Sequence, residues 1–161
     1  MRLFAVLALV IVLTGCSRVP ALAETYPGAE SLAEAVLDAL ARKNRAALEA
    51  MALSEQEFRD HVWPELPAAR PERNLPFSYV WGDLRQKSAG ALSETLARHG
   101  GRRYELVRVE FNGQTDYQSY RVHREATFRV RDAGQEQTLR VCGSFIEKDG
   151  AWKVFSFVVD D

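Results

Sequence analysis

The spacing of apolar residues changes at Gly100-Gly101, and this change constrains the fold more than any other feature of the 161-residue chain. Before the two glycines, apolar residues recur every three or four positions, which is typical of amphipathic helices. After them, apolar and polar residues alternate, which is typical of strands with one buried face. Helices followed by strands predict an α+β domain rather than an alternating α/β fold.

The helical half contains three segments with this spacing. They are residues 29–42, 45–52 and 77–99. Ser31 with Glu34, and Ser54 with Glu57, have the spacing of capping boxes, and the second box predicts a further short helical turn. Prolines at four positions between residues 64 and 76 predict an extended loop on the surface.

The strand half predicts a curved four-stranded antiparallel meander against which the helices pack. The predicted strands are residues 103–111, 117–131, 137–146 and 151–159. Turn sequences rich in Asn, Asp and Gly separate them. In the second strand, strict alternation places Arg121, His123 and Glu125 together on the polar face.

The N-terminus resembles a bacterial lipoprotein signal. Arg2 precedes an apolar run over residues 3–13, which is shorter than the roughly 20 residues that a membrane-spanning helix needs. Leu13-Thr14-Gly15-Cys16 follows directly and resembles a lipobox, in which small residues precede a cysteine that receives a lipid. We therefore expect Cys16 to be the lipidated first residue of the mature protein.

The segment also allows two other interpretations. Ala21-Leu22-Ala23 has the pattern of an ordinary signal-peptidase site, although it lies far beyond the apolar run. Cys16 and Cys142 are the two cysteines and could instead form a disulfide. Lipidation agrees best with the position and the flanking residues, and it leaves Cys142 as a small core residue without a partner.

The predicted organisation is therefore a signal peptide over residues 1–15, the lipidated cysteine and a tether over 16–28, and one α+β domain over 29–161. Ser17 follows the cysteine, where an aspartate would resemble the inner-membrane retention signal. We expect the protein at the outer membrane, facing the periplasm, with the membrane as a partner through its lipid and an envelope protein as a further candidate partner.

The order of elements resembles the nuclear transport factor 2-like superfamily, which includes ketosteroid isomerase and the SnoaL-like cyclases. The similar features are the opening LAEAVLDALARKNRAALEAM and the closing FRVRDAGQEQTLRVCGSFIEKDGAWKVFSFVVD. The resemblance implies a cone-shaped domain with a pocket between sheet and helices. None of the superfamily's catalytic motifs matches a position here, so it implies no catalytic residue.

Composition and spacing exclude several function classes. A formal net charge of -1 does not favour nucleic acid as a partner. His61, His99 and His123 lie far apart without the spacing of metal ligands, so neither a metal nor another cofactor is expected.

The candidate ligand-binding residues are two aromatic side chains and one polar row. They are Trp63, Trp81, Arg121, His123 and Glu125. Trp81 is the expected wall of a pocket beside residues 77–99, and Arg121 its polar anchor if that face of the strand turns inward. A binding or accessory domain is the leading hypothesis. A small isomerase or cyclase acting on an apolar substrate, and a structural lipoprotein of envelope assembly, are the alternatives.

Overall fold

The computed structural model describes residues 19–159, which form four α-helices, four short helical turns of other types, and seven strands. The helices are α1 (Ala29–Ala41), α2 (Arg45–Met51), α3 (Glu55–Glu57) and α4 (Phe77–His99). The short turns are η1 (Phe58–Val62), η2 (Trp63–Glu65), η3 (Pro67–Ala69) and η4 (Pro71–Arg73). The helices precede the strands, and the predicted α+β class is confirmed.

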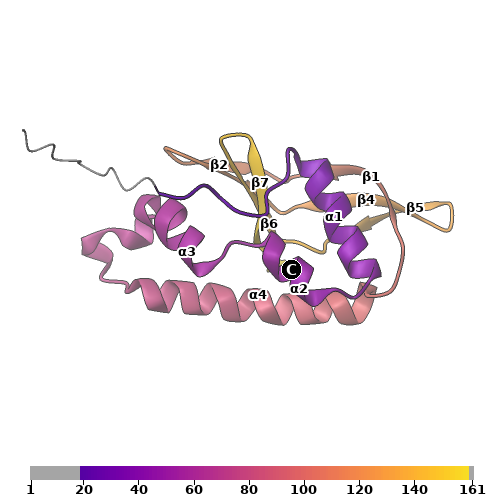
Figure 1. Ribbon diagram of the computed structural model, residues 1–161, viewed down its shortest axis with the longest axis horizontal. Helices are drawn as coiled ribbons and strands as arrows, with labels where there is room; N and C mark the ends of the chain where they lie inside the picture. The colour runs from indigo at the N-terminus through magenta and orange to yellow at the C-terminus, as the bar shows by residue number, and fades with distance from the viewer. Residues whose placement is uncertain (1–18, 160–161) are drawn as a thin grey trace, which may run out of the picture.

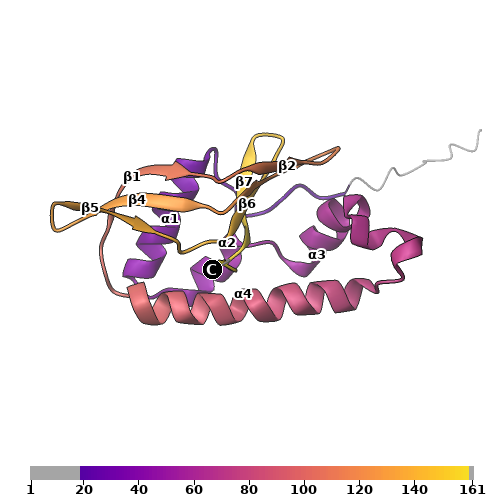
Figure 2. The ribbon, with the colours of Figure 1, turned by 180° about the vertical axis from the view of Figure 1, so that it is seen from behind.

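The strands form two antiparallel sheets. They are β1 (Glu105–Glu110), β2 (Gln114–Asp116), β3 (Arg121–Arg124), β4 (Thr127–Asp132), β5 (Gln135–Leu139), β6 (Ser144–Lys148) and β7 (Ala151–Ser156). One sheet has the order β1-β4-β5 and the other the order β2-β3-β6-β7. Figure 1 shows α1 beside the strands and α4 along the opposite side, with α2 and α3 between α4 and the strands. The view from behind gives the same order (Figure 2).

The predicted long strand over residues 117–131 is in fact two strands in different sheets. β3 ends at Arg124, the next residue, Glu125, has a φ of 52°, and Thr127 begins β4. A positive φ is unusual for a residue other than glycine and turns the chain sharply. The inward alternation nevertheless continues across the break, because Val122 and Phe128 are both buried.

The predicted third strand is also divided, here by a close approach of the backbone. Residues 140–143 connect β5 to β6. A Cβ atom on Gly143 would lie 1.6 Å from the carbonyl oxygen of Val158, so only glycine fits. Cys142 therefore lies in this connection and not within a strand, although it is buried as expected. Burial raises the pKa of its thiol, which keeps the thiol protonated.

Smaller differences have local causes. The N-cap of α1 is Gly28, and the Ser31 hydroxyl donates to the Gly28 carbonyl, so the predicted Ser31 capping box is wrong. The Ser54 box is present in full. The proline-rich segment forms the short turns η2, η3 and η4 rather than extended chain. An irregular register between Leu106 and Arg108 leaves the Val107 side chain exposed.

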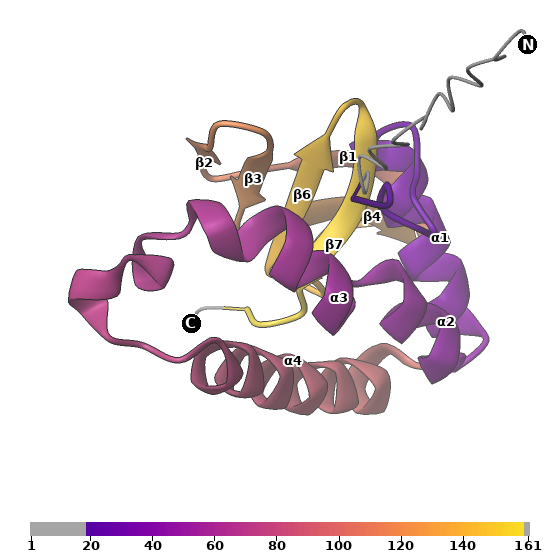
Figure 3. The ribbon, with the colours of Figure 1, turned by 60° about the vertical axis from the view of Figure 1, so that its left-hand side comes forward.

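The interior has two hydrophobic cores. The α1 core joins α1 to both sheets, and its fully buried members include Leu32, Val36, Leu40, Phe128, Val130 and Phe145. The Phe58 core joins η1 and the first half of α4 to the four-stranded sheet, and its buried members are Leu53, Phe58, Val62, Tyr120, Val122 and Ile146. Figure 3 shows α3 and the following turns spread over β6, with α4 below them.

The left-handed backbone at Glu125 gives a test of the sheet boundary. We expect Glu125→Val to lower the free energy of unfolding by about 1–2 kcal/mol, because a β-branched side chain is strained at positive φ. Glu125→Asn should cost less, since asparagine tolerates this conformation. Urea unfolding of both variants measures the difference, and equal losses would contradict this account.

Candidate functional site

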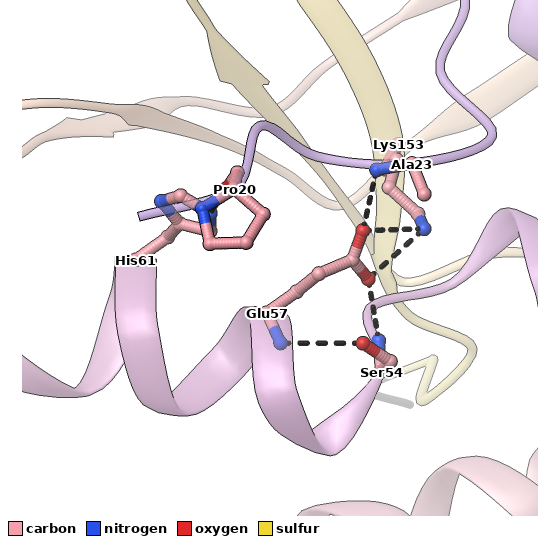
Figure 4. Close-up of polar contacts among 6 residues, drawn as sticks. All are labelled: Pro20, Ala23, Ser54, Glu57, His61 and Lys153. Atoms are coloured by element: carbon pink, nitrogen blue, oxygen red, sulfur yellow. Dashed lines mark hydrogen bonds and ion pairs between the residues drawn. The ribbon is translucent and has the colours of Figure 1, made fainter. Parts of the chain in front are cut away.

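A buried ion pair joins α3 to the last strand. Glu57 and Lys153 are 8% and 2% exposed, and the Lys153 ammonium lies 3.1 and 3.0 Å from the two Glu57 carboxylate oxygens. The carboxylate also accepts hydrogen bonds from the backbone N–H groups of Ala23 and Ser54, each at 2.8 Å (Figure 4). Four donor contacts on one carboxylate offset the cost of removing both charges from water.

The pair has a local origin in the capping box that opens α3. The Ser54 hydroxyl accepts from the Glu57 backbone N–H at 3.2 Å, and the Glu57 side chain turns back to the Ser54 N–H. This geometry fixes the Glu57 side chain before any long-range partner is added. Lys153 of β7 then contacts the Glu57 carboxylate. The next residue of β7, Val154, is fully buried.

The net electrostatic effect favours the charged carboxylate. Burial on its own would raise the pKa of Glu57, but the hydrogen bonds from Ser54 and Ala23, together with Lys153, outweigh it and hold this pKa below its usual range. The Glu57 carboxylate is therefore charged at neutral pH, and its contact with Lys153 acts as a fixed structural link.

Residues 19–26, which we call the strap, are bound to the domain at three points. The Pro20 carbonyl lies 2.7 Å from the Nε2 atom of His61 on η1. The Ala23 N–H donates to Glu57. Tyr26 exchanges two backbone hydrogen bonds with Trp152, at 2.9 and 2.8 Å. This part of the segment that the sequence predicts as a tether is thus an integral part of the fold.

A cavity of about 460 Å³ lies on the other side of α3, between α4 and the end of β7. Its apolar walls are Leu53, Trp81, Leu84, Leu92, Phe155 and Phe157. Ser54, Ser88 and Ala89 also line it. The volume is within the range of small-molecule sites, about 300–1,000 Å³, and the mixture of apolar walls with a few polar groups is typical of them.

Of the three charged side chains that line the cavity, two are in ion pairs and one is not. Glu49 is paired with Arg45 at 2.7 Å, and Glu55 with Arg59 at 2.9 Å. Arg85 also lines the cavity, and no ion pair to it is present among residues 19–159. The cavity therefore combines apolar walls with one uncompensated cation, which suits an apolar molecule that carries an anionic group.

Of the two tryptophans predicted to bind a ligand, one lines the cavity and the other does not. Trp81 lines the cavity and packs on Phe58, with 5.2 Å between ring centroids. Its indole N–H is buried and has no hydrogen-bond partner within the described part of the chain. Trp63 packs edge-on against Phe77 at 5.6 Å in the Phe58 core and is not among the cavity residues.

The predicted polar row is only partly formed, and it lies away from the cavity. Arg121 and His123 converge on Glu147, at 3.7 and 2.8 Å, and the His123 ring stacks on Trp152. Glu125 lies beyond the break in the strand and accepts a hydrogen bond from the Asn112 side chain. Val122, between Arg121 and His123, faces the Phe58 core, so the polar face turns away from it.

The other histidines have structural partners. His61 holds the strap, and His99 lies 2.9 Å from the Tyr104 hydroxyl. Burial, and then the nearby Arg102, lower the pKa of His99. Among residues 19–159 no group of three or more His, Cys, Asp or Glu side chains is placed to hold a metal ion. The expectation of a protein without a cofactor stays a prediction.

The predicted lipidation site, Cys16, lies outside the described residues. The described chain begins three residues after it, at Val19. Within residues 19–159, no helix is both long enough and apolar enough to cross a bilayer.

Comparisons of the chain with protein-family models, with characterised proteins and with solved structures gave no match. The resemblance to the nuclear transport factor 2-like superfamily therefore stays a prediction.

The buried pair gives a stability prediction. We expect Lys153→Met to lower the free energy of unfolding by about 3–5 kcal/mol, because it leaves the Glu57 carboxylate buried without its cation. Glu57→Gln combined with Lys153→Met should recover much of the loss, since the amide oxygen still accepts backbone hydrogen bonds. Lys87→Met, at an exposed surface pair, is the matched control and should leave the free energy of unfolding nearly unchanged. Urea unfolding measures all three.

The contribution of Glu57 to stability has a pH dependence of defined sign, which the single variant Glu57→Gln tests. Because the folded-state pKa of Glu57 is lowered, its contribution is complete above the unfolded-state value near 4.5 and is lost as the pH falls through the folded-state value. The stability advantage of the wild type over Glu57→Gln should accordingly be constant at neutral pH and shrink in acid. An advantage that grew with acidification would contradict the assignment.

Proposed function

We propose that the protein is a lipoprotein of the bacterial envelope, anchored through Cys16 at the outer membrane and carrying a small periplasmic binding domain. The apolar run over residues 3–13 and the LTGC sequence after it support the anchor. The cavity beside α4 supports a binding role.

The single observation that carries the binding role is the composition of that cavity. Six apolar side chains surround about 460 Å³, and Arg85 is its uncompensated charge. We therefore propose a small, largely apolar ligand with one anionic group, such as a carboxylate. Arg85 takes the place of polar anchor that the sequence suggests for Arg121, and Trp81 keeps its proposed place as a wall.

The superfamily resemblance is compatible with this proposal and adds no residue to it. Members of the nuclear transport factor 2-like superfamily place a pocket between helices and a sheet. Here the cavity lies between α4 and the end of β7. The His123 cluster lies outside the cavity, so the proposed binding function does not depend on the histidines.

The anchor is tested by Cys16→Ala. We expect the wild type, produced in a bacterium with its own lipoprotein pathway, to be processed and to partition into the detergent phase. The variant lacks the thiol that accepts the lipid, so it should remain unprocessed and lose the lipid-dependent partitioning. Labelling with a radioactive fatty acid provides the second measurement, and label retained in the variant would refute the assignment.

The cavity is tested with two fluorescent probes of similar size. One is neutral, N-phenyl-1-naphthylamine, and the other carries a sulfonate, 8-anilinonaphthalene-1-sulfonate. We expect Ala89→Phe, which adds a ring at the cavity wall, to weaken both by about ten-fold, or about 1.4 kcal/mol. Arg85→Gln should weaken only the anionic probe.

Two variants serve as controls for this test. Ala97→Phe makes the same change at an exposed position of α4 away from the cavity, and Arg121→Ala removes an exposed arginine outside it. Both should leave probe binding unchanged. Binding that is insensitive to Ala89→Phe would show that the probes occupy another surface.

A further inference from the structure

The strap limits how far the domain can move from a lipid on Cys16. Pro20 is held by His61, and Ala23 by the buried Glu57 carboxylate. Tyr26 is paired with Trp152 in an antiparallel bridge. These contacts fix the chain from Pro20 onward to the body of the domain.

The remaining connection is short. Four residue steps separate Cys16 from Pro20, and a chain in any conformation spans at most about 3.6 Å per residue, or about 14 Å in total. A lipid carried by Cys16 enters the bilayer at that residue. The Pro20 end of the strap consequently cannot lie far from the lipid surface.

From these contacts we infer that the domain rests directly on the bilayer, with the strap side of α3 and η1 facing the lipid and the cavity on the opposite side of α3. This inference rests on the lipid anchor of the proposed function. Figures 1–3 agree that α3 lies between the strap and α4. The cavity is lined by α4 and by Leu53, Ser54 and Glu55 at the start of α3.

The exposed groups at the start of the strap fit a lipid surface. Val19 is 52% exposed and is one of the few large apolar side chains with this exposure in the described chain. Pro20 and Ala21, which follow it, are also exposed and uncharged. Glu24 is the only charged residue of the strap, so the strap itself offers no cation to anionic lipids.

The orientation is tested with the lipidated protein in phospholipid vesicles that contain an acceptor-labelled lipid. A donor dye is attached at Ala21→Cys, beside Pro20, or at Ala97→Cys, toward the far end of α4. Both are exposed alanines. The lipid occupies the Cys16 sulfur and Cys142 is buried, so the dye reacts with the introduced cysteine. We expect much stronger energy transfer to the lipid from position 21 than from position 97.

A linker provides the matched control. A Gly/Ser insertion of about 20 residues between Ser17 and Arg18 has a root-mean-square length of about 25 Å and should abolish most of the contrast between the two positions. Equal transfer from both positions in vesicle-bound protein would overturn the orientation while leaving the anchor intact. A contrast that persists with the linker would overturn the role of the short connection. Failure of the protein to remain on vesicles would overturn the anchor itself, and the orientation with it.

Discussion

The buried contact between Glu57 and Lys153 joins α3 to β7 through two charged side chains inside the protein. It connects residues 96 positions apart, and the same carboxylate also binds the backbone of Ser54 and Ala23. A carboxylate with this many donors has little freedom to move, and its removal would leave a buried lysine uncompensated. The short helix α3 could not be stable alone, so its position depends on this contact and on the burial of Phe58.

This position of α3 gives its two sides different roles. On one side, the Glu57 carboxylate binds Ala23 of the strap and Lys153 of β7. On the other, Leu53, Ser54 and Glu55 line the cavity opposite α4. The proposed membrane-facing surface and the proposed ligand site are therefore separated by one layer of helix. A ligand that enters the cavity would contact the same short segment that binds the strap, but from the side opposite the proposed membrane-facing surface.

Local rules predict the helices well, because caps and apolar spacing act within a few residues. The strand boundaries depend on distant contacts: the break at Gly143 exists because the Val158 carbonyl approaches it, and no local sequence signal encodes that approach. Within the site, spacing predicts Trp81 at a pocket wall and the Ser54–Glu57 box. Lys153 was missed as the partner, although a lysine in the apolar run AWKVFSFVV was a usable signal. The sequence does not single out Arg85 as a ligand-binding residue. Its charge is uncompensated because Glu49 and Glu55 pair with other arginines, and that pairing is known only from the fold.

The cavity itself follows from the way in which α4 bridges two cores. Phe77, Val80, Trp81 and Leu84 pack against the Phe58 core, and Leu92 and Leu96 belong to or pack against the α1 core. Between them the helix presents the small side chains of Ala89 and of Ser88, whose hydroxyl accepts a hydrogen bond from the Phe157 N–H at 3.0 Å. Only Leu92 and Thr95 of this helix are buried. Close packing against a core at each half of α4 fixes the distance of this helix from the sheet. Because the side chains in the middle of α4 are small, a cavity remains between the two cores.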